Sequence, residues 1–108
     1  KNGLYSAVVP FITHTPYVME ALLELSREGR VGAPAKQLFL ASWDFLLSLR
    51  TMHQSKDQLA LSYAPLEEPR TVVNANAYAA FAYAMHFSYG IEESKPKSLI
   101  RVKKLLVW

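Results

Sequence analysis

The chain contains no cysteine in its 108 residues, which excludes disulfide bonds, thiolate catalysis and cysteine-ligated zinc. No apolar run reaches the roughly 18 residues that a membrane-spanning helix needs. The first residues do not resemble a signal peptide, so we expect a cytoplasmic protein with no membrane span. The histidines and carboxylates show no metal-ligand spacing, and we expect neither a metal nor a cofactor.

Apolar residues make up 51% of the chain and aromatic residues 12%, which is enough for one small domain with a packed core. The net charge of +3 comes from a basic cluster near the C-terminal end, since the rest of the chain is roughly neutral. The cluster lacks interleaved aromatic residues and matches no helix-turn-helix or zinc pattern. We therefore interpret it as a solvated helix face and expect no nucleic-acid partner. Its members are Lys95, Lys97, Arg101, Lys103 and Lys104.

Both ends of the sequence look truncated. Lys1 is not an initiator methionine, and residues 105–108 continue an amphipathic pattern with no glycine cap or proline stop. We therefore expect a fragment of a longer protein.

Apolar spacing, together with proline and glycine positions, predicts four helices at about 15–28, 34–53, 74–89 and from 96 onward. Thr15 can cap the first helix, Pro16 suits its first turn, and Gly29 would close it before a short link at 30–33. Gly90 would end the third helix. In the long connection of residues 55–71, residues 59–63 are predicted to form a short extended piece.

Two of these helices have one apolar side, and one is apolar nearly all round. Phe39, Trp43, Leu46 and Leu47 form the predicted stripe of the second helix, while Leu99, Ile100, Leu105 and Leu106 are predicted to point inward from the fourth. The third helix is rich in alanine and aromatic residues, so we expect it to be buried on most sides. Short links favour antiparallel pairs. The predicted fold class is all-α, with stacked antiparallel helical hairpins.

A polar loop before the third helix carries two adjacent carboxylates. Glu67 and Glu68 could serve as general acid and base, because sugar chemistry often uses a pair of carboxylates. Neighbouring loop residues usually point apart, however, and we favour a structural ion pair with Arg70. One functional carboxylate, Glu67, stays in the prediction as a candidate catalytic residue, with Arg70 as a candidate ligand-binding residue.

Other polar side chains gather at the two helix starts. Asn74 and Asn76 suit an N-cap, but two amides exceed what one cap needs, and amides bind sugar hydroxyls well. His14 precedes the first helix, whose N-terminus favours a neutral imidazole suited to catalysis; a buried, hydrogen-bonded histidine is the plainer alternative. Tyr63 in the loop is the candidate for stacking on a sugar ring.

Three segments carry a resemblance to a known group of proteins. FITHTPYVMEALL at 11–23, SYAP at 62–65 and VNANAYAA at 73–80 resemble uncharacterised proteins of bacterial polysaccharide-biosynthesis clusters, which look like (α/α) toroids of the six-hairpin glycosidase type. The resemblance implies a ring of helical hairpins in which the first and third helices are inner and their N-terminal loops line a cavity. Four helices cannot close a ring of about twelve, so the resemblance implies a fragment of such a toroid.

We therefore expect a polysaccharide-biosynthesis protein that handles carbohydrate in a helical cavity. Hydrolase, lyase and epimerase chemistry all remain open, and the alternative is a non-catalytic helical-repeat scaffold that binds protein partners. Self-association through apolar helix faces is a further expectation, and a DNA-binding bundle ranks third. The predicted site comprises Glu67 and His14 as catalytic residues, with Tyr63, Arg70, Asn74 and Asn76 binding the substrate.

Overall fold

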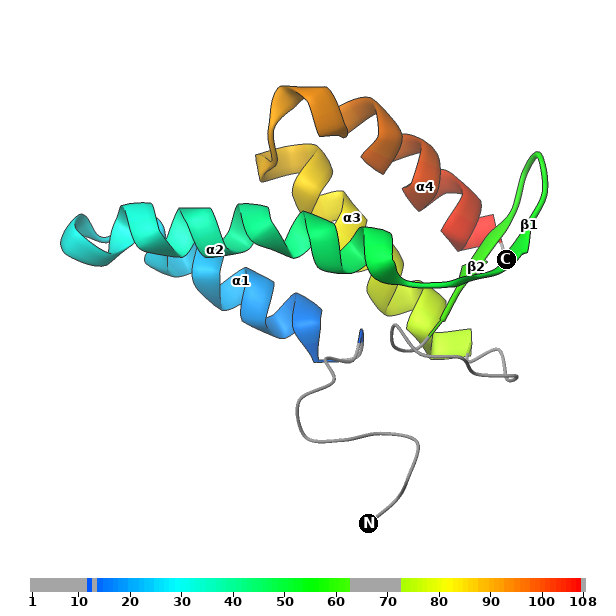
Figure 1. Ribbon diagram of the computed structural model, residues 1–108, viewed down its shortest axis with the longest axis horizontal. Coiled ribbons are helices and arrows are strands. Elements are labelled where there is room, and N and C mark those ends of the chain that lie inside the picture. The colour runs from blue at the N-terminus through cyan, green and yellow to red at the C-terminus, as the bar shows by residue number, and fades with distance from the viewer. Residues whose placement is uncertain (1–11, 13, 63–72, 108) are drawn as a thin grey trace, which may run out of the picture.

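The computed structural model describes residues 12, 14–62 and 73–107, with 73 and 74 described by their backbone alone. The described part of the chain is mostly helical, as the sequence predicts, and contains four helices and a short two-stranded sheet, whose arrangement is drawn in Figure 1. The mainly α-helical character predicted from the sequence is confirmed, and the small sheet is an addition that the sequence did not predict. The elements in chain order are α1 (Thr15–Leu25), α2 (Gly29–Ser48), β1 (Thr51–Gln54), β2 (Leu59–Leu61), α3 (Val73–Tyr89), a 3-10 turn η1 (Glu92–Ser94) and α4 (Lys95–Val107).

The first two helices form an antiparallel hairpin, as predicted, but with a tighter connection (Figure 1). Gly29 does not close α1; it begins α2, and the predicted link at 30–33 is helical. Pro34 therefore lies inside α2, where it cannot donate a hydrogen bond to the preceding turn. Gly32 explains the tightness, because a Cβ atom there would lie 2.9 Å from the backbone oxygen of Ser26.

The second helix ends at Ser48, and the predicted helix over 34–53 is wrong at its C-terminal end. Residues 51–54 instead form β1, which pairs antiparallel with β2 through a four-residue turn closed by the backbone N–H of Ser55 donating to Gln58 O at 2.9 Å. The pairing extends beyond the strands, since Ser62 N donates to Arg50 O at 2.8 Å. The extended piece predicted from residue 59 is confirmed over 59–61.

The third and fourth helices form a second hairpin, which Gly90 makes possible. Its N–H donates to His86 O at 2.9 Å, and a Cβ atom at this position would lie 2.5 Å from that same oxygen. The chain can therefore turn this closely only with glycine at position 90. The prediction that Gly90 ends α3 is confirmed.

The core is centred on α3, which contacts α1, α2, α4 and β2. Four of its alanines, Ala75, Ala79, Ala80 and Ala82, are buried, so neighbouring helices approach it closely, as the composition predicted. The predicted inward faces of α2 and α4 are only partly right. Leu105 is buried and Leu99 half-buried, but Ile100 and Leu106 of α4 and Leu47 of α2 are exposed.

The helices α1 and α3 lie side by side and run in the same direction (Figure 1). Near their N-terminal ends the rings of Tyr17 and Tyr78 meet edge to face, with centroids 6.0 Å apart. This places the starts of the first and third helices together. Among the described residues, no helix combines the length and apolar character needed to cross a membrane.

Candidate functional site

Three of the six residues of the predicted site lie outside the described part of the chain. Tyr63, Glu67 and Arg70 belong to the segment 63–72, and Asn74 is described only as a backbone position in the first turn of α3. His14 is exposed at the N-cap position of α1, where its carbonyl accepts hydrogen bonds from Tyr17 N and Val18 N at 3.2 and 3.4 Å. Their convergence on one cavity therefore stays a prediction.

Asn76 is buried, and both ends of its side-chain amide bind strand β2. Its Oδ1 accepts a hydrogen bond from Leu61 N at 2.9 Å, and its Nδ2 donates to Leu59 O at 2.8 Å. The side chain thus occupies the edge of the strand as a neighbouring strand would. This is neither the helix cap nor the ligand contact that the sequence suggested, and it attaches the β-hairpin to the central helix.

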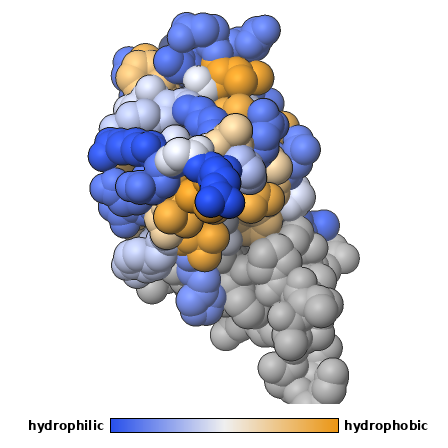
Figure 2. All heavy atoms as spheres, turned by 90° about the vertical axis from the view of Figure 1, so that its left-hand side faces the viewer, coloured by the Kyte–Doolittle hydropathy of each residue, from blue (hydrophilic) through white to orange (hydrophobic). Residues whose placement is uncertain are grey.

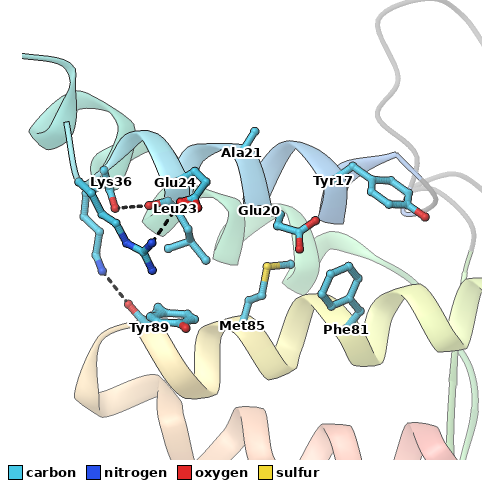
Figure 3. A pocket seen from close by; sticks show the side chains of 11 residues that line it. Tyr17, Glu20, Ala21, Leu23, Glu24, Lys36, Phe81, Met85 and Tyr89 are labelled. Carbon is cyan, nitrogen blue, oxygen red and sulfur yellow. Dashed lines mark hydrogen bonds and ion pairs between the residues drawn. The ribbon is translucent and has the colours of Figure 1, made fainter.

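A cleft of about 630 Å³ lies between α1 and α3, with the start of α2 at one end (Figure 3). Helical spacing explains its two walls. Tyr17, Glu20 and Glu24 lie on one face of α1, because they are three and four residues apart. Phe81 and Tyr89 lie on one face of α3, eight residues apart, with Met85 between them. The remaining lining residues are Ala21, Leu23, Ser26, Arg27 and Lys36.

Aromatic rings on both walls reach solvent. Tyr17 is 57% exposed, Tyr89 50% and Phe81 36%. The Tyr17 ring is held edge-on to Tyr78, and hydrogen bonding with the Tyr78 side chain raises the pKa of Tyr17, with smaller contributions from Tyr78 charge, burial and Glu20. Open ring faces of this kind are available for stacking on a ligand.

The charged side chains of the cleft divide into paired and unpaired groups. Arg27 forms an ion pair with Glu24 at 3.1 Å, and Lys36 Nζ donates to the backbone oxygen of Tyr89 at 2.9 Å, where a cation suits the C-terminus of α3. Glu20 is different, because its carboxylate makes no hydrogen bond or ion pair with any described residue. In Figure 3 it lies between the helices, on the side of Phe81 and Met85.

The wall formed by α3 is held against α2 by a buried histidine. His86 stacks on Phe39 with centroids 4.6 Å apart, and its Nε2 lies 2.9 Å from Ser42 Oγ. Because Ser42 Oγ already donates to Phe39 O at 2.6 Å, the geometry fits a neutral imidazole that donates from Nε2. Burial, and then the charge of Lys36, lower the pKa of His86 to about 4.

One end of the molecule mixes apolar and charged surface. Figure 2 shows hydrophobic side chains around strongly hydrophilic ones at the end of the molecule where the helical connections lie. Leu25, Val31 and Ile91 are among the exposed apolar residues near these connections.

The cleft is not predicted by the sequence. The spacing of Tyr17, Glu20 and Glu24 was visible, but which face of α1 borders α3 depends on packing between segments about 60 residues apart. The all-round apolar character of α3 also concealed that Phe81 and Tyr89 reach solvent. The sequence predicts a site at the polar loop and the helix starts, whereas the described cleft runs along the length of α1 and α3.

Among the described residues, no group of three histidine, aspartate or glutamate side chains is arranged to hold a metal ion. Comparison with known proteins adds no relative: no family model, curated protein or solved structure matches this chain. The chemistry of the cleft is therefore the structural basis for assigning a function.

Proposed function

We propose that the protein binds carbohydrate in the cleft between α1 and α3, and that it acts in the biosynthesis of a surface or capsular polysaccharide. One observation carries the binding proposal: exposed aromatic rings of Tyr17, Phe81 and Tyr89 lie around a carboxylate, Glu20, that has no partner among the described residues. The polysaccharide context rests on the sequence resemblance.

This combination suits the two surfaces of a sugar. The C–H face of a pyranose ring packs on an aromatic ring, while its hydroxyls donate hydrogen bonds to a carboxylate. Phe81 and Tyr89 would supply the first contact and Glu20 the second. The volume of about 630 Å³ falls within the roughly 300–1,000 Å³ that small-molecule sites occupy.

The parallel inner helices support the toroid part of the proposal. In a ring of hairpins the inner helices run in one direction and present their N-terminal ends to a shared cavity, and α1 and α3 have this relationship through Tyr17 and Tyr78. We propose that His14, Glu67, Asn74, Tyr63 and Arg70 lie around that same end. Catalysis there by Glu67 and His14 is the enzymatic form of the proposal.

The binding proposal is tested with single variants on the two walls, each with a matched control. Glycan-array screening selects an oligosaccharide, and isothermal titration calorimetry then measures its Kd. We expect Glu20→Gln to raise the Kd roughly tenfold, since it removes a charge-assisted hydrogen bond. Glu28→Gln is the control, because Glu28 is exposed beyond the end of α1 and does not line the cleft.

On the opposite wall, Phe81→Ala should raise the Kd by about 2- to 10-fold through loss of ring stacking. Its control is Phe87→Ala, on the same helix, exposed to a similar extent and outside the cleft. Equal losses in Phe81→Ala and Phe87→Ala would contradict binding in the cleft. So would a glycan array on which the protein retains no oligosaccharide.

Exposed apolar residues on the outer helices favour a second candidate function, that of a helical scaffold for protein partners. Leu38 of α2 and Leu106 of α4 are 60% and 69% exposed. Such side chains suit protein contacts, including self-association. Sedimentation velocity would then show concentration-dependent association that Leu38→Lys or Leu106→Lys abolishes. A monomer at all concentrations would contradict self-association.

A further inference from the structure

A second groove lies on the other side of the molecule's core, between the β-hairpin and α4. Its volume is about 420 Å³. Gln54 of β1 and Leu59 of β2 form one wall, and the opposite wall is a face of α4. The second wall consists of Pro96, Lys97, Ile100, Arg101 and Lys104 of α4, together with Glu93 of the preceding turn η1.

The groove is strongly basic. Lys97, Arg101 and Lys104 are four and three residues apart, so they project from the same face of α4. Glu93 is the one acidic residue among those that line the groove. The C-terminal basic cluster of the sequence is therefore divided by the fold: Lys97, Arg101 and Lys104 line the groove, while Lys103 is exposed outside it.

One of the three cations is held in place, and the other two have no partner among the described residues. Arg101 lies over the Tyr83 ring, 5.5 Å from its centroid, and its Nη1 donates to the Tyr83 hydroxyl at 3.3 Å. Lys97 and Lys104 make no ion pair or hydrogen bond with any described residue, although Glu93 lines the same groove. The Arg101 guanidinium is thus oriented by its contact with Tyr83, whereas the ammonium groups of Lys97 and Lys104 are available to bind a ligand.

The positive charges of this groove lower the stability of the folded protein unless an anion binds there. Like charges at positions i and i+4 of a helix repel, which applies to Lys97 and Arg101. Lys97 also lies in the first turn of α4, where the helix dipole disfavours a cation. An anion in the groove would relieve both effects. Apolar side chains of Leu59 and Ile100 lie in the same lining and would contact the uncharged part of the ligand.

We propose that this groove binds the carboxylate or phosphate group of a small saccharide-sized ligand. Arg101 presents a planar fork that suits two oxygens of one oxyanion, and Lys97 and Lys104 add positive charge on either side of it along the helix. Gln54 offers an amide to a hydroxyl. The groove is separate from the cleft between α1 and α3, and its role does not depend on carbohydrate binding there.

The test is an NMR titration of the 15N-labelled chain at low salt with three probes: glucuronate, glucose 6-phosphate and neutral glucose. We expect the amide signals of residues 97–104 and of Gln54 to shift with one or both charged sugars and not with glucose. Comparison of the two charged sugars distinguishes a carboxylate from a phosphate ligand. Signals of Tyr17 and Phe81 report the other cleft, so failure of either site is seen separately.

The matched variants are Lys97→Gln with Lys104→Gln, compared with Lys103→Gln. Each substitution removes one positive charge from α4, but only positions 97 and 104 line the groove. We expect the Kd of the charged sugar to rise roughly tenfold in the double variant and to change less than twofold in the control. Circular dichroism confirms that both variants remain helical.

Four results would overturn the proposal. The first is an equal response to glucose and to both charged sugars, and the second is an equal loss of affinity in Lys103→Gln. The third is the absence of any shift at residues 97–104 at low salt. Tighter binding of a single-stranded oligonucleotide than of either charged sugar to these residues would also overturn it, in favour of a nucleic-acid surface.

Discussion

The side-chain oxygen of Asn76 accepts a hydrogen bond from the backbone N–H of Leu61 at 2.9 Å, deep in the contact between α3 and strand β2. The same amide donates to Leu59 O at 2.8 Å. A strand of three residues is too short to be stable alone. The paired amide therefore joins the β-hairpin to the central helix, and the hairpin in turn forms one wall of the basic groove.

Replacing Asn76 tests this attachment. Asn76→Ala should lower the free energy of unfolding by about 2–4 kcal/mol, because a buried N–H and a buried carbonyl each lose their partner. Urea denaturation measures the change. Gln54→Ala is the control, since this exposed amide lies on the other strand of the same hairpin, and its effect should stay within about 0.5 kcal/mol. Equal effects would contradict a special role for Asn76.

His86 should make stability depend on pH. Its pKa is lowered from 6.5 to about 4 in the folded state, so the unfolded chain binds the proton more readily between those values. Stability should therefore be fully present above about pH 6.5 and fall by about 1–3 kcal/mol as the pH drops toward 4. Urea midpoints between pH 7 and 4 measure this. The loss should be smaller in His86→Leu; an identical slope would assign it to other groups.

Gly29 and Gly90 should respond in opposite ways to alanine. At Gly90 a Cβ atom would lie 2.5 Å from His86 O and 3.1 Å from His86 Nδ1, so Gly90→Ala should cost about 1–3 kcal/mol. At Gly29 nothing lies within 4 Å, and alanine favours the helix that begins there. Gly29→Ala should leave the melting temperature unchanged or slightly raised. A neutral Gly90→Ala would show that the turn can relax.

Ala80 tests how tightly the central helix is packed. It is buried at 4% exposure, and Ala80→Leu should overpack the contact and cost about 1–3 kcal/mol. Ala77→Leu makes the same change at an exposed position three residues earlier and should be within about 0.5 kcal/mol of neutral. Thermal melts of both variants give the comparison. A tolerated Ala80→Leu would mean that α3 is not the centre of the core.

Much of the helical organisation could be predicted from the sequence. The third helix was predicted at 74–89 and lies at 73–89, and both antiparallel hairpins were predicted from short connections. Gly90 was identified as the stop. These features depend on the conformational preferences of single residues and on the spacing of apolar residues, and both can be read from a short stretch of sequence.

The β-hairpin was missed because helix and strand preferences compete in a short segment. Residues 51–54, Thr-Met-His-Gln, follow α2 without an intervening glycine or proline, and their strand conformation depends on pairing with 59–61. A signal was present in the polar turn at 55–58, which separates two short runs of possible strand. Asn76 was misread for the same reason: its partners Leu59 and Leu61 lie 15 to 17 residues earlier in the chain.

The sequence by itself determined four helices, their pairing into hairpins and the burial of α3, because these follow from periodicity and from glycine and proline positions over a few turns. Only the tertiary structure decided which side chains share a site. Glu20 and Phe81 line the same cleft, whereas Lys103 does not share the groove that Lys97 and Lys104 line. Both arrangements depend on how the helices are rotated about their axes when they pack. That rotation is set by contacts between residues far apart in the chain, among them Tyr17 with Tyr78 and Arg101 with Tyr83.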